Sequence, residues 1–196
     1  MRERTRRLAQ AELTVIAQDL FVEQGYEETT VDQIAAAAGM SKRTFFRYFA
    51  SKDDLVIGKY DLFGDRMAEA LSSRPADEPV WESMRRVFDI ASVYMVEGPE
   101  KARNEAMERI VRSTPTLNAR YLEKLSHMQA LLVDEVARRL RDGATGVDPL
   151  DPRPTAIVGA AFGCLTAAQA AFQASNQARP FDELLDEAMS SFRIII

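Results

Sequence analysis

The sequence predicts an all-α fold of about nine helices. Apolar residues recur at spacings of three and four, as they do along one face of an α-helix. No long segment alternates polar and apolar residues with period two, and only the three final isoleucines, 194–196, have the composition of a strand. Short stretches with proline or glycine separate helices of roughly 10 to 27 residues. They lie at residues 75–79, 98–99, 114–115, 142–154 and 179–180.

The composition is that of an ordered chain that folds without cross-links. It has 196 residues, 46% of them hydrophobic, which is enough to build a core. Its single cysteine, Cys164, has no partner for an intramolecular disulfide, and no cluster of histidine and cysteine offers metal ligands. We therefore expect no metal, no cofactor and a reducing cytoplasmic environment.

Neither the N-terminal segment nor the most apolar later segment predicts insertion into a membrane. The basic residues 1–7 are not followed by an uninterrupted apolar stretch, because polar residues from Gln10 onward break it, so no signal peptide is expected. Residues 156–174 are mostly Ala, Gly and Thr, and Gln169 and Gln173 interrupt them, which favours a buried helix. We expect a soluble protein without a membrane partner.

The net charge of −5 is unevenly distributed along the chain. The first 60 residues hold nine Lys or Arg and nine Asp or Glu, so the whole deficit lies in the later residues. Within the first part the cations cluster at residues 2–7 and 42–52. One face of this part could therefore be positive and bind an anionic partner such as nucleic acid.

Capping signals mark two short helices in the first part of the chain. A first helix has an apolar face from Leu13 to Phe21 and ends near residue 24, before Gly25. Thr30 and Gln33 have the spacing of a capping box. This spacing predicts a second helix over residues 31–38.

A turn and a third helix follow. Gly39 supplies the tight turn, and Ser41 can cap a helix on which Phe45 and Phe49 lie four residues apart on one face. A fourth, longer helix starts near Asp54. Such a series of short helices can place one helix in a groove of DNA.

The third helix carries the most informative residues. Its outward side holds Lys42, Arg43, Thr44, Arg47 and Tyr48 within two turns, opposite the phenylalanines. A major groove about 12 Å wide admits one such helix, whose side chains then reach base edges and phosphates. A solvated amphipathic helix that is merely basic would carry the same charges, so the charges alone leave both interpretations open.

The pattern over residues 13–55 resembles the TetR family of bacterial regulators. It reads TVDQIAAAAGMSK for the capped helix and turn, then TFFRYF and SKDDL. The resemblance implies a helix-turn-helix head that binds double-stranded DNA. It also implies phosphate contacts for Thr30, Lys42, Tyr48 and Lys52, and base contacts for Arg43, Thr44, Phe46 and Arg47.

The third helix departs from the family pattern at the positions that face bases. Family members often have Gly or Ala at the position of Arg43, and Tyr at those of Phe46 and Arg47. Arginine donates twice to guanine O6 and N7, so we expect guanines in the half-site, each worth about 1 to 3 kcal/mol of discrimination. Phe46 is expected to contact a thymine methyl. The basic residues 2–7 either follow the DNA or form a frayed terminus.

The resemblance further implies a DNA-binding domain at residues 1–55 and a larger body at 56–196. The body's middle helices would enclose a small apolar or aromatic effector, with an acyl thioester as one option, beside large and flexible side chains. Ordinary core packing is the alternative for each. The candidates are Phe63, Met67, Phe88, Met95, Met107, His127, Met128 and Phe162.

The last two helices are expected to pair with a second copy of the chain. Small residues on one helix permit close approach, and the apolar stripe on the last helix needs covering. The chain's own body is the alternative cover for that stripe. The predicted interface residues are Ala160, Gly163, Ala167, Ala170, Phe181, Leu184, Leu185, Ala188 and Phe192.

Together with the resemblance, these features predict a regulator that binds a palindromic operator as a homodimer and is released by a small molecule. The family habit implies a repressor, but an activator would use the same head, and the residues do not decide between the two. Its two heads would read half-sites about 35 Å apart. A regulator without an effector and a nonspecific architectural DNA binder are the alternatives. An enzyme is not expected, because one histidine, one cysteine and no glycine-rich phosphate loop offer little for catalysis.

Overall fold

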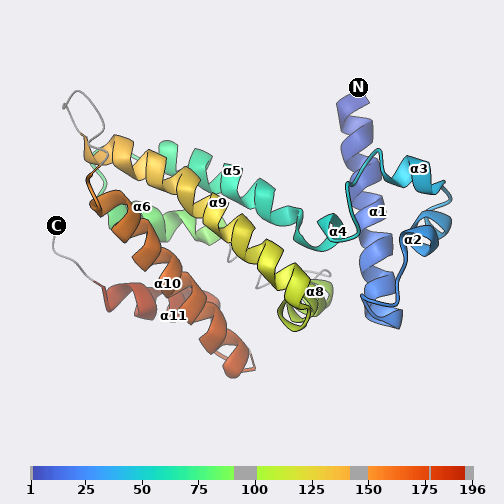
Figure 1. The fold of residues 1–196 in the computed structure, drawn as a ribbon. Helices are drawn as coiled ribbons and strands as arrows, with labels where there is room; N and C mark the ends of the chain where they lie inside the picture. The colour runs from blue at the N-terminus through green and yellow to red at the C-terminus, as the bar shows by residue number, and fades with distance from the viewer. Residues whose placement is uncertain (1, 91–100, 142–149, 177, 193–196) are drawn as a thin grey trace. The chain divides into compact units, whose positions relative to one another are not determined.

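The computed structural model describes residues 2–90, 101–141, 150–176 and 178–192. Within these ranges the chain forms helices and turns and no strand, which confirms the all-α prediction (Figure 1). Two predictions, for Met95 and for the isoleucines 194–196, lie outside the described residues. The helices are α1 (Arg2–Gln24), α2 (Val31–Ala37), α3 (Lys42–Phe45), α4 (Asp54–Ile57), α5 (Lys59–Ser72), α6 (Val80–Val87), α8 (Lys101–Ser113), α9 (Pro115–Leu140), α10 (Arg153–Ala174) and α11 (Phe181–Ser190).

The contacts within the chain define two compact units. We call residues 1–60 and 99–123 the head unit, and residues 61–98 and 124–196 the body unit. The head unit thus combines the N-terminal helices with α8 and the first part of α9. The predicted boundary at residue 55, between the DNA-binding domain and the body, differs in kind from these packing units, and it stays a prediction.

Helix α1 is longer than the sequence suggested. It begins at Arg2, so the basic N-terminal segment continues the helix. Its buried face contains Leu13, Ala17 and Phe21, each at most 2% exposed. The helix ends where expected, because Gly25 adopts a φ of +96° and donates its amide to the carbonyl of Phe21 at 3.2 Å.

Helices α2 and α3 follow the predicted signals, but α3 is short. Gly39 makes the turn between them with a φ of +65°. Regular α-helix ends at Phe45, and residues 46–48 continue as a turn rather than as the expected second helical turn. The physical reason is that the amides of Arg47 and Tyr48 bond to carbonyls three residues back, at 3.1 and 2.8 Å, which tightens the coil.

Three polar contacts join α8 to the N-terminal part of the head unit. Tyr60 donates its hydroxyl to Glu108 at 2.6 Å, and the ammonium of Lys59 lies 3.0 Å from the same carboxylate oxygen. Burial first, and then the charge of Glu108, raise the pKa of Tyr60. Arg103 pairs with Asp19 of α1 at 2.9 Å. These contacts make α8 part of the head unit although it is distant in sequence.

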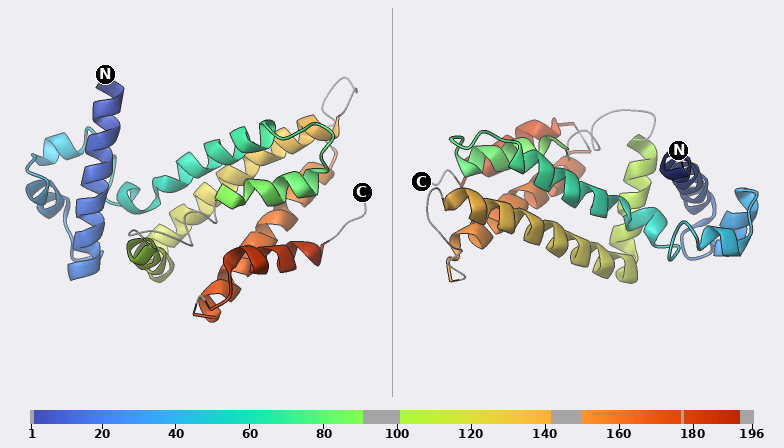
Figure 2. Two further views of the ribbon diagram at one scale, coloured as in Figure 1. Left: turned by 180° about the vertical axis from the view of Figure 1, so that it is seen from behind. Right: turned by 90° about the horizontal axis from the view of Figure 1, so that it is seen from above.

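The body unit is built around α10, which packs on α6 and lies beside α11 in every view (Figure 1, Figure 2). Trp81 of α6 donates its indole N–H to the carbonyl of Met189 at 3.2 Å. The rings of Phe88 and Phe162 meet edge to face, with centroids 5.4 Å apart. These contacts place Trp81 as a packing anchor of the unit.

By length and composition alone, α10 could cross a membrane, since its most apolar window has a mean hydropathy of 1.5. However, 44% of that window is buried inside the protein. Ile157, Phe162 and Leu165 are among the buried side chains of the helix. A core helix has the same apolar composition, so the buried face of α10 accounts for its hydropathy.

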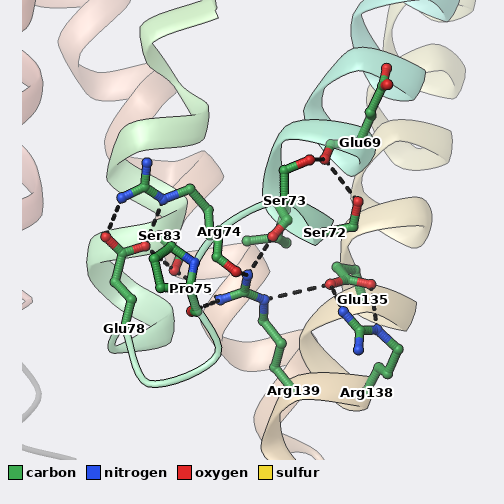
Figure 3. Close-up of polar contacts among 11 residues, drawn as sticks. Glu69, Ser72, Ser73, Arg74, Pro75, Glu78, Ser83, Glu135, Arg138 and Arg139 are labelled. Atoms are coloured by element: carbon green, nitrogen blue, oxygen red, sulfur yellow. Dashed lines mark hydrogen bonds and ion pairs between the residues drawn. The ribbon is translucent and has the colours of Figure 1, made fainter.

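A buried polar cluster closes the C-terminal end of α5 (Figure 3). Arg139 of α9 donates through Nη2 to the carbonyls of Leu71 and Arg74, at 2.5 and 2.7 Å. Its Nη1 donates to the carbonyl of Pro75 at 3.3 Å and to Ser83 Oγ at 3.0 Å. Because the last carbonyls of a helix have no amide partner within it, the guanidinium acts as a cap from another helix.

Candidate nucleic-acid interface

The start of α2 is closed by a reciprocal cap. The amide of Gln33 donates to Thr30 Oγ1 at 3.2 Å, and the amide of Thr30 donates to Gln33 Oε1 at 2.7 Å. This is the predicted capping box, and Thr30 itself is exposed. The cap gives the amide of Gln33 a partner, and the phosphate contact of Thr30 stays a prediction from the family resemblance.

Helix α3 presents its polar side to solvent because its apolar side is anchored. Phe45 is fully buried, and its ring lies 5.9 Å from that of Phe49 between centroids. Ser41 caps the helix by accepting the amide of Thr44 at 3.2 Å. The residues predicted to contact DNA lie around this anchor. Lys42, Arg43, Phe46 and Arg47 are exposed, and Thr44 and Tyr48 are half-buried.

Phe46 is the most unusual of these side chains, because 49% of a large aromatic ring is exposed. Its ring leans edge-on against buried Phe45, with centroids 5.3 Å apart. An exposed apolar ring is suited to contact with a thymine methyl group, as the sequence predicted. The carbonyl of Tyr48 accepts a hydrogen bond from Gln10 of α1 at 3.1 Å, which fixes the end of this segment.

Lys42 is held by an acidic neighbour in the free protein. Its ammonium lies 2.8 Å from Asp32 Oδ2, and both side chains are more than half exposed. Pairs this exposed contribute only about 0 to 1 kcal/mol. A DNA phosphate could therefore replace Asp32 as the partner of Lys42.

Lys52, the other predicted phosphate contact, is directed into the protein. Its ammonium donates to the carbonyls of Tyr26 and Thr29, at 2.7 and 3.1 Å, and lies 4.1 Å from the centroid of the Tyr26 ring. Two of its three N–H donors thus hold the segment between α1 and α2. The phosphate role of Lys52 stays a prediction from the family resemblance.

The sequence did not predict a network of charged side chains in the segment that follows α3. Arg120 of α9 donates to Asp53 Oδ2 at 2.7 Å and to Asp54 Oδ1 at 3.0 Å. The hydroxyl of Tyr26 donates to the other oxygen of Asp53 at 2.5 Å. Burial alone would raise the pKa of Asp53, but the hydrogen bonds from Tyr26 and Arg120 outweigh it and lower that pKa. This network could not be predicted from the sequence, because Arg120 lies 67 residues from Asp53.

The predicted ligand residues are not all brought together. Met67, Phe88, Met128 and Phe162 are buried in the body unit, where Phe63 is half-buried. Met107 is buried in the head unit, and His127 is exposed. Phe88 and Phe162 contact each other edge to face, and their predicted ligand role stays a prediction beside the alternative of core packing. Across the described ranges, His, Cys, Asp and Glu form no group of three or more that could hold a metal ion.

The predicted dimer residues divide by helix. On α10, Gly163, Ala167 and Ala170 are exposed and Ala160 is half-buried. On α11, Phe181, Leu184 and Leu185 are buried, Ala188 is half-buried, and Phe192, just beyond the helix, is 50% exposed. Helices α10 and α11 pack on each other, so the chain itself covers the apolar stripe of α11. Gly163, Ala167 and Ala170 of α10, together with Phe192, are the members of the predicted set that are exposed.

Two family models match this chain. The model of bacterial regulatory proteins of the tetR family matches residues 14–57, and that of the MftR C-terminal domain matches residues 78–194. The chain is 32% identical to the HTH-type transcriptional regulator TcmR of Streptomyces glaucescens, over 98% of this chain and 86% of that protein. It is 27% identical to the mycofactocin biosynthesis regulator MftR of Mycobacterium tuberculosis, over 63% of this chain and 62% of that protein.

Solved structures share the fold at low sequence identity. A TetR-family regulator from Syntrophomonas wolfei has a TM-score of 0.63 at 19% identity, covering 94% of this chain and 93% of that one. SmeT, a repressor of a Stenotrophomonas maltophilia efflux pump, has a TM-score of 0.60 at 17% identity, covering 93% and 89%. The match to residues 14–57 contains the helix-turn-helix formed by α2 and α3. The chain therefore belongs to the TetR family of bacterial regulatory proteins and is a DNA-binding transcriptional regulator.

Proposed function

We propose that this regulator is a cytoplasmic repressor that binds a palindromic operator as a homodimer and leaves it when a small molecule binds the body. The observation that carries the DNA-binding part is the exposed polar side of α3, held outward by the fully buried Phe45. In this proposal Arg43, Thr44, Phe46 and Arg47 face bases. Thr30, Lys42, Tyr48 and Lys52 face phosphates.

The dimer is proposed to form through the exposed small residues of α10. Small side chains let two backbones approach closely, and a two-fold axis would place the same face of each copy in contact. Two heads joined in this way would read half-sites about one helical turn apart, roughly 35 Å. Phe192, with half of its ring exposed, would extend the contact.

The effector is proposed to be an apolar or aromatic compound, with acyl thioesters as one class to test. Methionine and phenylalanine are frequent among the buried side chains of the body unit, and methionine adapts to irregular apolar shapes. FadR of Thermus thermophilus, a fold neighbour at 19% identity and a TM-score of 0.56, was solved with lauroyl-CoA. The effector would act by binding better to a conformation with lower DNA affinity. No enzymatic role is proposed for the chain.

The full chain should select one palindrome from a random-sequence duplex library. We expect the selected half-sites to contain guanine and to have centres about 10 base pairs apart, because each head places one helix in the major groove. Sequencing of the bound fraction measures this. Equal recovery of all sequences would identify a nonspecific architectural binder instead.

Release by a small molecule is tested separately on the same duplex. Acyl thioesters and aromatic compounds are added to the protein–DNA complex, and anisotropy follows dissociation of the DNA. Release by one of them supports the effector. If none raises the melting temperature of the protein or releases the DNA, a regulator without an effector is favoured.

Replacing Lys42 by Ala should weaken binding to every duplex to a similar extent. Lys42 is proposed to neutralise a phosphate, so its removal should reduce the salt dependence of binding by roughly 0.9 in log–log slope for each phosphate that is no longer neutralised. Fluorescence anisotropy over a series of salt concentrations measures the slope. Replacing Asp32 by Asn is the matched control, since it frees Lys42 from its 2.8 Å partner and should leave the slope intact. Equal slopes for wild type and the Lys42 variant would contradict the phosphate role of Lys42.

A further inference from the structure

Helix α3 is too short to fix its own direction. It has a single regular turn, Lys42–Phe45, and isolated helices of this length are not stable in water. Its position therefore depends on the burial of Phe45 and on the structure that holds its two ends. Ser41 and the turn at Gly39 hold the first end. Residues 50–54, which we call the exit segment, follow the other end and lead into α4.

The guanidinium of Arg120 holds the exit segment at three points. Nη1 donates to Ser51 Oγ at 3.1 Å and to Asp53 Oδ2 at 2.7 Å, and Nη2 donates to Asp54 Oδ1 at 3.0 Å. The side chain of Arg120 is 36% exposed, and those of the two aspartates are 27% and 24% exposed. A planar guanidinium suits such a set of acceptors because its donors point in fixed directions.

Asp54 transmits this grip to the backbone that follows α3. Its second oxygen, Oδ2, accepts the amides of Ala50 and Ser51, each at 3.0 Å. One carboxylate therefore joins Arg120 to two consecutive peptide groups. If Arg120 is removed, Asp53 and Asp54 become neighbouring carboxylates without their shared cation, and they repel each other.

The exit segment is held from its other side by the connection between α1 and α2. Tyr26, which is 7% exposed, donates to Asp53, and Lys52 donates to the carbonyls of Tyr26 and Thr29. The carboxylate of Asp53 thus lies between a phenol and a guanidinium. The exit segment is therefore held between the α1–α2 connection and α9. Arg120 and Tyr26, which hold it, are not part of the proposed DNA surface.

We propose that Arg120 is a positioning residue for DNA recognition, which sets the direction of α3 through Asp53 and Asp54. This inference rests on the proposed function of α3 as the helix that reads the operator. It assigns to α9 a role in operator affinity that does not require Arg120 to touch DNA.

The test compares Arg120→Gln with a matched control, Arg103→Gln. Arg103 also joins a later helix to the N-terminal helices of the head unit, but through Asp19 of α1, away from the exit segment. Affinity is measured by anisotropy with the duplex that the wild-type chain selects. We expect Arg120→Gln to bind on the order of tenfold more weakly, because a charge-assisted network is removed, and Arg103→Gln to bind within about twofold of wild type.

Hydrogen exchange supplies a readout that general destabilisation would not reproduce. In Arg120→Gln the amides of Ala50 and Ser51 should exchange faster, while that of Gly25, which bonds to Phe21 in α1, keeps its wild-type rate. Arg120→Lys keeps the charge but not the fork, so it should restore only part of the affinity. This milder variant also provides the result if Arg120→Gln does not fold.

The outcomes separate this inference from the proposed function. If the wild-type chain selects no duplex, the proposed function fails. Independently of that result, unchanged hydrogen exchange of the amides of residues 50 and 51 in Arg120→Gln would overturn the inference. If a duplex is selected and Arg120→Gln binds it as wild type does, the positioning role alone is wrong. Equal losses of affinity in the Arg103 and Arg120 variants would also overturn it, because docking of any later helix would then suffice.

Discussion

Replacing Arg139 by Met should lower the free energy of unfolding by about 3 kcal/mol, because it removes a buried cation that caps α5. The side chain of Arg139 is 6% exposed and bonds to three carbonyls and to Ser83. Methionine fills similar space but removes the donor to the carbonyl of Arg74 and to Ser83 Oγ, while the carbonyls of Leu71 and Pro75 each keep one backbone amide. Urea denaturation measures the change as a lower midpoint at constant slope.

Arg138 is a matched control for this variant. It pairs with the same carboxylate, Glu135, but its side chain is 58% exposed. Replacing it by Met should cost less than about 1 kcal/mol, since exposed pairs contribute little. Comparable decreases in stability for the two variants would show that the ion pair with Glu135, and not the cap on α5, carries the effect.

The cluster around Arg139 extends to the loop between α5 and α6. Ser83, which is fully buried, donates to Glu78 at 2.6 Å while it accepts from Arg139. Arg74 bonds to both oxygens of Glu78. These hydrogen bonds, from Arg74 first and Ser83 second, lower the pKa of Glu78 to about 2. The loop is therefore part of a connected polar network rather than a loose connection.

The difference between Arg138 and Arg139 shows where prediction from sequence ends. Both are basic residues in the last turn of a long helix, where a cation interacts favourably with the negative end of the helix dipole. Only the fold shows that one meets carbonyls up to 68 residues away while the other lies in solvent. The partners of Arg120, which belong to the exit segment, are likewise shown only by the fold.

Local chemistry, in contrast, can be predicted from the sequence. The capping box of Thr30 and the turns at Gly25 and Gly39 each depend on residues within a few positions, and all three are present. The exposure of the polar side of α3 was predicted because its polar residues lie on the side of the helix opposite Phe45. The sequence also indicated that the apolar stripe of α11 needs covering and favoured a second copy of the chain for it, whereas α10 of the same chain packs on α11 in this structure, and a stripe does not say which surface covers it.

The length of α3 changes the expected roles of its two arginines. The sequence suggested two helical turns, on which Arg43 and Arg47 would lie four apart on one face. In the structure Arg43 is in the first turn of α3, and Arg47 lies in the turn that follows the regular helix. Residues at the start of a recognition helix are those that meet base edges. Arg43 is therefore the better placed of the two for guanine.

Replacing Arg43 by Ala should remove the preference for guanine at one position of each half-site. The decrease in discrimination is expected to be about 1 to 3 kcal/mol per half-site, because alanine cannot donate to guanine O6 and N7. The change occurs twice when a dimer binds a palindrome, which makes it the largest change expected in DNA recognition. Competition between the selected duplex and duplexes substituted at single positions measures it. The Lys42→Ala variant should weaken all of these duplexes alike, and Arg47→Ala should relax the sequence preference less than Arg43→Ala does. A weaker guanine preference in the Arg47 variant than in the Arg43 variant would show that the turn after α3, rather than its first residues, enters the groove.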